Sequence, residues 1–258
     1  VGISVSKLNS STSTLSEVEN GSSITSSGTI TVDSNVYHEH SSVVNGTSVS
    51  VVASGQALDS AWEDNSTAKA ILGDLAAVTA RNLNVNANIN RVYDGHAYGG
   101  SAALLGAISG AGIHANIGGG ATAGLGNQSG SKVNSGSFEI SEAASITATA
   151  DSTLKGEGVT PSVGIFSGAG TGVCLNSDSD AKVYVGKGEK LRAEDVTLKA
   201  QVTPVADASA HGYSVGGVGV GTAIARIEQK DDAIVHVGEG AQLQATNEAN
   251  IAANSNQP

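Results

Sequence analysis

The feature that most constrains this chain is an internal repeat about 52 residues long. Residues 182–200 (KVYVGKGEKLRAEDVTLKA) return as residues 234–253 (IVHVGEGAQLQATNEANIAA), and residues 68–87 fit the same frame. A chain of similar units folds as a stack of repeats, so its function is a question about a stack rather than about one pocket. The positions matched 52 residues later are Val183, Val185, Gly186, Gly188, Leu191 and Ala193 with Val235, Val237, Gly238, Gly240, Leu243 and Ala245.

Each repeat begins with apolar residues that alternate with polar ones. The shared pattern is V-x-V-G-x-G-x-x-L-x-A-x-x-V-T-L-x-A, and its period of two predicts β-strands. The interruptions at Gly186, at Gly188 and at Glu194–Asp195 are typical of turns, so we expect short strands of about three to six residues. No segment sustains helical periodicity. The best helix candidate is residues 56–70, and its last part already belongs to a strand pattern.

The second half of each repeat is rich in glycine and alanine. Residues 101–126, 162–176 and 214–227 alternate small residues with Val, Ile and Leu. Glycine in a strand often marks a close backbone approach, so these segments predict two closely packed layers. Residues 118–126 also suit an inserted flexible linker, which would explain the long spacing of 63 residues between the repeats marked at Leu72 and Ser135.

The composition supports thin, regular layers. The chain has 258 residues, of which 34 are Gly and only 3% are aromatic. Aromatic side chains bury the most surface per residue, and a globular enzyme of this length normally uses more of them. The apolar content consists of Ala, Val, Ile and Leu, and its patterning argues against disorder.

These patterns predict one all-β parallel solenoid over residues 1–258, cut from a longer array. We expect each repeat to form about two coils of roughly 26 residues, each rising about 4.8 Å. Residues 35–65 form an irregular unit in which the glycine-rich half is nearly lost. The alternative is a β-sandwich with long hairpins built from the glycine-rich halves. The repeats are marked at Val18, Leu72, Ser135, Val185 and Val237.

Charge and cysteine content exclude several classes of partner. The formal net charge is -11 and the pI is about 4.8, which argues against nucleic acid and against electrostatic anchoring to a membrane. No stretch approaches the roughly 20 apolar residues that span a bilayer, so we expect no membrane insertion by this segment. The single Cys excludes an internal disulfide framework and most Cys-based metal sites.

The pairing of VGxGAxLxA-xxVTLxA modules with SVGGVGVGxAxA segments resembles the repeat regions of large secreted bacterial filamentous adhesins. The nearest resemblance is to filamentous-haemagglutinin-like and leukotoxin-type filamentous adhesins of Gram-negative bacteria, and it is best from about residue 68 onward. The resemblance implies a right-handed parallel β-helix that is exported to the cell surface and acts in cell adhesion and virulence. It carries over no catalytic residue.

Few residues suggest chemistry. His38 and His40 lie two apart in a strand pattern and could share a metal ion, but no third ligand is near and an exposed polar strand face is favoured. His96, His114, His211 and His236 are scattered, and none is assigned a catalytic role. Cys174 lies in a small-residue strand, where we expect a small buried hydrophobe.

The carboxylates also favour a structural role. Asp178 and Asp180, and likewise Asp231 and Asp232, are close enough in sequence for glycoside hydrolysis, but they recur ahead of each repeat start. Calcium-binding nonapeptides, P-loops and dinucleotide motifs are absent. The Thr-x-Thr sequences at 29–31 and 147–149 do not recur in other repeats, which argues against an ice-binding surface.

The sequence therefore predicts no catalytic, cofactor-binding or metal-binding residues and no enzyme. We expect an extracellular structural or adhesive segment of a bacterial surface protein. Its partner would be a host-cell or matrix protein, a glycan receptor or another bacterial cell. Contact would be made through residues 35–62, notably residues 37–40 and Trp62, or through an insertion at Gly118. A stalk without its own receptor, a polysaccharide-active β-helix enzyme and a filament subunit that associates end to end through exposed β-edges remain as alternatives.

Overall fold

The computed structural model describes residues 1–127 and 136–256. These residues form 16 strands in two sheets, and the described part of the chain contains no helix. It therefore has no helical segment suited to crossing a membrane. All strand pairings among the described residues are parallel, which confirms the all-β prediction and excludes the sandwich of long hairpins.

The chain alternates between the two sheets. Sheet A contains β1 (Gly2–Ser10), β2 (Ser13–Val18), β5 (Ala53–Asp64), β6 (Thr67–Leu72), β9 (Gly106–Leu125), β12 (Phe166–Val185), β14 (Val218–Gln229) and β15 (Asp232–Val237). Sheet B contains β3 (Ser23–Thr25), β4 (Thr29–Ser50), β7 (Ala77–Ala80), β8 (Asn82–Ala103), β10 (Ser137–Ile140), β11 (Ala143–Val163), β13 (Lys190–Val215) and β16 (Gln242–Ser255).

One sequence repeat is one complete circuit through both sheets. Val18 pairs with Leu72, Leu72 with Leu125, Leu125 with Val185, and Val185 with Val237. The prediction of two coils per repeat was wrong, because strands such as β4 and β13 run for 22 and 26 residues without a turn. The marker Ser135 lies outside the described residues, and Leu125 occupies the paired position of the third circuit.

The glycine and polar interruptions have two different structural meanings. Gly188 and Gly240 form true turns and have positive φ angles of 79° and 74°, a conformation that glycine adopts without strain. The Glu194–Asp195 doublet instead lies inside β13, where the register with β16 shifts between Ala193 and Asp195. β16 has one more residue than β13 across this shift, so the bulge lies in β16 while both strands continue.

Two segments predicted to be irregular are regular strands. Residues 35–65 pair in register with β8 and β9 throughout β4 and β5, and the helix candidate at residues 56–70 is extended as β5 and β6. Residues 118–125 belong to β9 and pair with β12, so the extra length of the third repeat follows Leu125. The linker predicted at residues 118–126 is therefore wrong.

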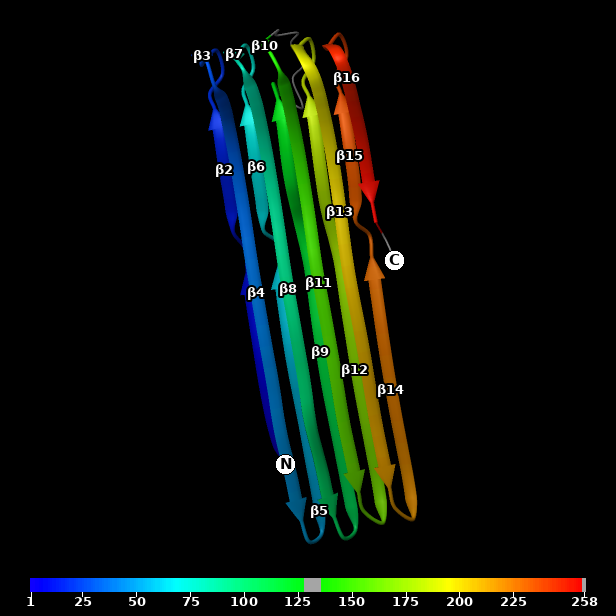
Figure 1. Ribbon diagram of the computed structural model, residues 1–258. Helices are drawn as coiled ribbons and strands as arrows, with labels where there is room; N and C mark the ends of the chain where they lie inside the picture. The colour runs from blue at the N-terminus through cyan, green and yellow to red at the C-terminus, as the bar shows by residue number, and fades with distance from the viewer. Residues whose placement is uncertain (128–135, 257–258) are drawn as a thin grey trace.

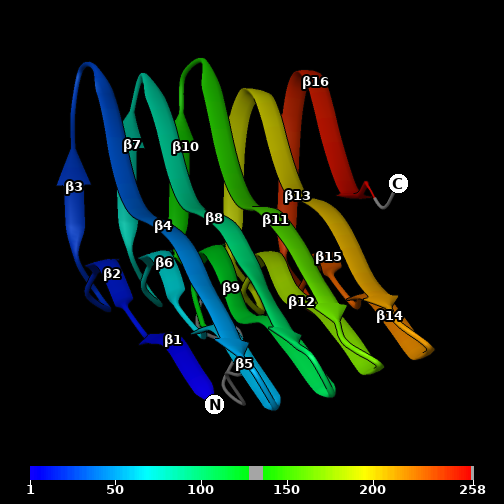
Figure 2. The same ribbon diagram turned by 90° about the horizontal axis from the view of Figure 1, so that it is seen from below.

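The strands run side by side over most of the length of the molecule, and the connections between the two sheets lie at its two ends (Figure 1). We call the half toward β3, β7 and β10 the upper half, and the half toward the turns at 51–52, 104–105, 164–165 and 216–217 the lower half. Figure 2 shows sheet B arching away from sheet A in the upper half and lying close to it at the lower turns. The stack is wide above and narrow below.

The interior side chains are aliphatic in the upper half and a mixture of aromatic, small and polar residues in the lower half. The upper half encloses a large cluster of Ala, Val, Leu and Ile, with Leu83, Val85 and Ile146 completely or almost completely buried. A second cluster in the lower half is built around Trp62 and Tyr93, whose rings stack with centroids 5.8 Å apart. Nearer the lower turns the inward residues are mostly serine, threonine and alanine, such as Ser109, Thr160 and Ser162.

The predicted close packing of the layers is confirmed only in part. A Cβ on Gly156 would lie 2.7 Å from Val173, and one on Gly158 would lie 2.4 Å from Thr171, so these inward glycines of β11 are required by sheet A. The glycines of β9 and β12 differ. Gly110, Gly168 and Gly170 alternate with buried residues and face outward, away from the other sheet.

Candidate functional site

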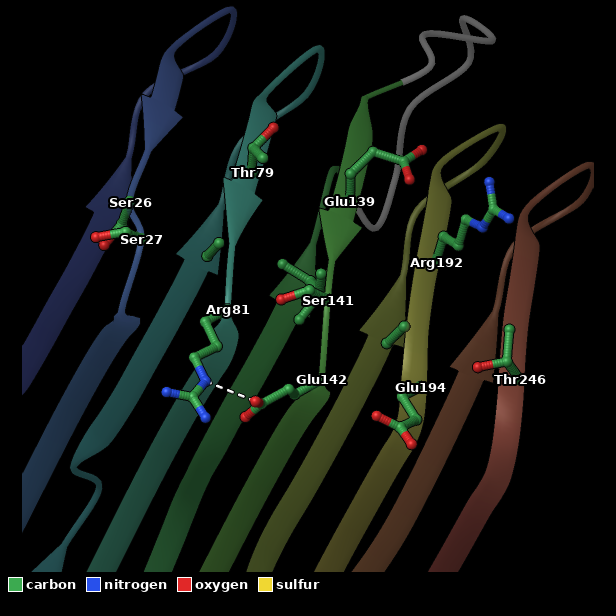
Figure 3. A pocket seen from close by; sticks show the side chains of 13 residues that line it. Ser26, Ser27, Thr79, Arg81, Glu139, Ser141, Glu142, Arg192, Glu194 and Thr246 are labelled. Atoms are coloured by element: carbon green, nitrogen blue, oxygen red, sulfur yellow. Dashed lines mark hydrogen bonds and ion pairs between the residues drawn. The ribbon is translucent and has the colours of Figure 1, made fainter.

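A broad hollow crosses the outside of sheet B in the upper half. It has a volume of about 600 Å³ and runs from the β3–β4 junction across β7, β10 and β13 to β16. Figure 3 shows its side chains on neighbouring strands, in a band that crosses the strand direction. Its polar and charged lining residues are Ser26, Ser27, Thr79, Arg81, Glu139, Ser141, Glu142, Arg192, Glu194 and Thr246.

The hollow forms because several strands of sheet B deviate at the same level. β7 ends one residue before Arg81, β10 and β11 are separated by Ser141 and Glu142, and the register of β13 with β16 shifts after Ala193. The backbone stays hydrogen-bonded through these irregularities, since Glu142 donates its N–H to the Arg81 carbonyl and accepts from Glu194 on its own carbonyl. Aligned bulges therefore produce a groove along the stack without opening the sheet.

The groove carries mixed charge. Arg81 Nε donates to Glu142 Oε1 over 2.6 Å, drawn as the dashed line in Figure 3, and Asn82 donates to the other carboxylate oxygen over 3.3 Å. The hydrogen bond and charge of Arg81 lower the pKa of Glu142 below its ordinary value. Arg192 and Glu194 add a further cation and carboxylate beside hydroxyl groups. Such a surface suits a polar, hydroxyl-bearing ligand rather than an apolar one.

A buried polar layer separates the two hydrophobic clusters. Its centre is Arg91, which is fully buried and donates to Ser179 Oγ over 2.7 Å and to the carbonyls of Ser66 and Gly118 over 2.9 and 2.6 Å. Its Nε lies 3.8 Å from Asp64 Oδ1. Burial lowers the pKa of Arg91, and the charges of Asp64 and Asp231 oppose that shift. The layer is therefore a charge-balanced contact between the two sheets.

His38 extends this layer to the first circuit. Its Nδ1 lies 2.5 Å from Asp64 Oδ2, and its Nε2 lies 3.1 Å from Thr12 Oγ1. Burial raises the pKa of Asp64, but hydrogen bonds from Ser66 and His38 and the charge of Arg91 hold it below its ordinary value. The Thr12 hydroxyl, the His38 imidazole and the Asp64 carboxylate are arranged in the same order as the catalytic triad of serine hydrolases. None of the described hollows is lined by Thr12 or His38, and Thr12 N–H is already bonded to Ser66 Oγ.

The sequence-based site candidates have mostly structural positions. His38 and His40 face inward, and His40 stacks near Trp62 and Tyr93, so the exposed polar face expected for this pair is wrong. No group of three potential metal ligands occurs within residues 1–127 and 136–256. Trp62 is buried and cannot contact a receptor directly, whereas Tyr37 is exposed and hydrogen-bonds to Glu39.

The structure also places the cysteine and two of the aspartates that the sequence analysis considered. Cys174 faces outward in β12 and is partly exposed, so the expected buried position is wrong. Asp180 pairs with Lys182 over 2.5 Å, while Asp231 is buried and accepts from Ser177 and the Ser179 N–H. Arg91 was missed in the sequence, although it falls on the inward parity of residues 83, 85, 87 and 89. The inward position of residue 91 in this alternation was the sequence signal that could have identified Arg91 as buried.

Comparison of the chain with protein-family models, curated proteins and solved structures found no match.

Proposed function

We propose that this chain is a non-enzymatic structural and adhesive segment of a large bacterial surface protein, built as a right-handed β-solenoid and displayed outside the cell. The observation that carries the proposal is the repetition of outward side chains in register across the strands of sheet B. Asn86 donates to Asp33 on one neighbour and accepts from Thr147 on the other, over 2.7 Å each. This surface is polar, extended and rigid, as a stalk or an attachment face requires.

The groove across sheet B is the best contact surface on that face. It offers hydroxyls, two arginines and three glutamates over several circuits, which suits a glycan or a polar loop of a receptor. Its length along the stack allows an extended ligand to meet equivalent positions such as Thr79, Glu139 and Arg192, which lie in register on neighbouring strands. Several weak polar contacts in one direction add up to useful affinity.

The test is binding of the purified chain to immobilised glycans, matrix proteins and host cells. Saturable binding that weakens at least about tenfold in Arg192→Ala and Glu194→Ala supports attachment through the groove. Lys199→Ala is the matched control, because Lys199 is an exposed cation on the same sheet outside the groove. Binding no stronger than that of an unrelated acidic repeat protein would contradict the adhesive role and leave a stalk.

A filament subunit is a second candidate, favoured by the open strand edges. In the described sheets β1 and β14 each pair with strands on one side, and so does β16. Unpaired parallel edges template further strands. If the chain assembles end to end, light scattering will rise with concentration without a plateau. Scattering that stays proportional to a fixed small mass would count against it.

A further inference from the structure

The outside of sheet A is an uncharged apolar surface from the lower turns up to the row before Asp59. We call it the glycine face and define it by the outward residues of β1, β5, β9, β12 and β14 near the lower turns. Its members are Ile3, Ala53, Gly55, Ala57, Gly106, Ile108, Gly110, Phe166, Gly168, Gly170, Val218, Val220 and Thr222.

The chain's own packing does not require the central glycines of this face. A Cβ on Gly170 would come no closer than 3.4 Å to another atom, one on Gly110 no closer than 3.8 Å, and one on Gly168 no closer than 4.0 Å. None of the three has a positive φ angle. Glycine inside a strand costs about 0.5–1 kcal/mol relative to alanine. These residues keep the outer surface flat at a cost that the isolated fold does not explain.

The large side chains around the glycines are strongly exposed. Ile108 is 69% exposed, Phe166 61% and Val220 61%, and they surround a hollow of about 450 Å³. With Ile3, Val218 and the apolar turn residues at 51–52, 104–105 and 165, the surface comprises ten exposed apolar side chains. At on the order of 100 Å² each, they offer about 1,000 Å², more than the roughly 800 Å² that each partner of a stable complex buries.

The charge distribution indicates which partner fits. Residues 41–58, 95–113, 158–177 and 208–225, which build the lower turns and most of the face, contain no Asp, Glu, Lys or Arg. The chain as a whole carries a net charge of -11, so two copies repel each other over most orientations. The glycine face is the surface on which copies can meet without bringing their charges together.

We propose that the glycine face binds the glycine face of a second copy of this chain. The contact is isologous, with the flat central glycines opposed and the side chains of Ile108 and Phe166 entering the hollow of the partner. Flat glycine surfaces let the two outer layers approach more closely than the usual spacing of about 10 Å between sheets. The proposal is independent of adhesion and of end-to-end assembly, since it uses the outside of a sheet and not its edges.

The test is sedimentation velocity of the chain over a range of concentrations, with Ile108→Glu and Phe166→Glu as variants. The wild type is expected as a dimer above about 10 µM, and each variant as a monomer, with the association constant lowered at least about tenfold. Val205→Glu is the matched control, because Val205 is 48% exposed on the outer face of sheet B. Circular dichroism confirms that each variant keeps its strands.

Gly170→Ala provides a second test that does not threaten the fold. The extra methyl fits within one copy but separates two opposed faces, so the dimer weakens while the monomer does not lose stability. A wild type that stays monomeric, or association that persists in Ile108→Glu, overturns the proposal, and the second result assigns association to the strand edges. Flotation of the monomer with zwitterionic lipid vesicles would also overturn it in favour of a lipid surface.

Discussion

The upper and lower halves of the molecule share strand pairing but differ in almost everything that the strands carry. Above the Arg91 layer the interior is aliphatic and the outside of sheet B is polar and hydrogen-bonded. Below it the interior changes to aromatic rings and then to serine and threonine, and the outside of sheet A is uncharged next to the lower turns. The distance between the two sheets depends on the size of the inward side chains, whereas the strand register is set by the sequence repeat. The same circuit can therefore be wide at one end and narrow at the other.

Replacement of Arg91 by alanine should have the largest effect on this division. The substitution leaves the buried Asp64 and Asp231 without their facing cation, so we expect the free energy of unfolding to fall by about 3–5 kcal/mol in chemical denaturation. Arg192→Ala, at an exposed arginine, should change it by no more than about 0.5 kcal/mol. Equal losses in the two variants would show that the layer does not hold the halves together.

Cavities in the two cores should act locally. Ile146→Ala in the upper cluster and Ile113→Ala in the lower cluster each remove a fully buried side chain, with an expected cost of about 2–5 kcal/mol. Native-state hydrogen exchange should show that each substitution lowers amide protection mainly in its own half. Uniform loss of protection across both halves would mean that the polar layer does not divide the molecule into separate cooperative units.

Glu189 gives the upper half a pH dependence that the uncharged lower turns lack. Burial raises the pKa of Glu189 to about 7, although the Gly136 N–H bonded to it opposes the shift. A carboxyl whose folded pKa is raised loses stability as pH rises from its unfolded pKa toward 7. Glu189→Gln should therefore be more stable than the wild type at pH 8, by on the order of 2 kcal/mol.

The wild type and Glu189→Gln should have nearly equal stability at pH 4, because Glu189 is then neutral in both the folded and the unfolded state. Thermal melting of the two proteins across this range is the measurement. The loss at acid pH that follows from the lowered pKa of Asp64 is common to both proteins and cancels in the difference. A stability difference that does not change between pH 4 and pH 8 would contradict the role of Glu189.

Two glycine substitutions should have the smallest effects, and they should differ in sign. Gly156→Ala places a methyl 2.7 Å from Val173, so we expect a loss of about 1–3 kcal/mol. Gly170→Ala meets nothing closer than 3.4 Å and should stabilise the monomer by about 0.5–1 kcal/mol. Denaturation at a protein concentration below that of any dimer measures both. Losses of equal size would mean that the outward glycines serve the fold after all.

The repeat predicted strand pairing better than it predicted chain path. The match of Val185 to Val237 and of Val18 to Leu72 gave the true register. The number of coils was wrong because a polar doublet such as Glu194–Asp195 fits a turn and a bulge equally well in sequence. Only the length of uninterrupted strand pairing on either side distinguishes a turn from a bulge, and that length depends on the neighbouring strands.

The site was less predictable for a related reason. Arg91 contacts Ser66, Gly118 and Ser179, which lie in the β5–β6 connection, in β9 and in β12. No local motif connects residues so far apart, and the groove depends on bulges that align only after stacking. The outward direction of Gly170 follows from the parity of β12, which glycine alternation alone does not reveal, because Gly219 and Gly221 in β14 face inward.

Parallel pairing between successive circuits has a mechanical consequence. The backbone hydrogen bonds between circuits point along the stack, and the two ends of the chain lie at opposite sides of it (Figure 1). Tension between the ends therefore loads these bonds directly and peels circuits from an open edge. A circuit of 52 residues contributes about 4.8 Å of height while folded, but up to about 180 Å of contour when pulled straight. Each lost circuit would lengthen the tether more than thirtyfold over its folded height and relieve the force on the rest.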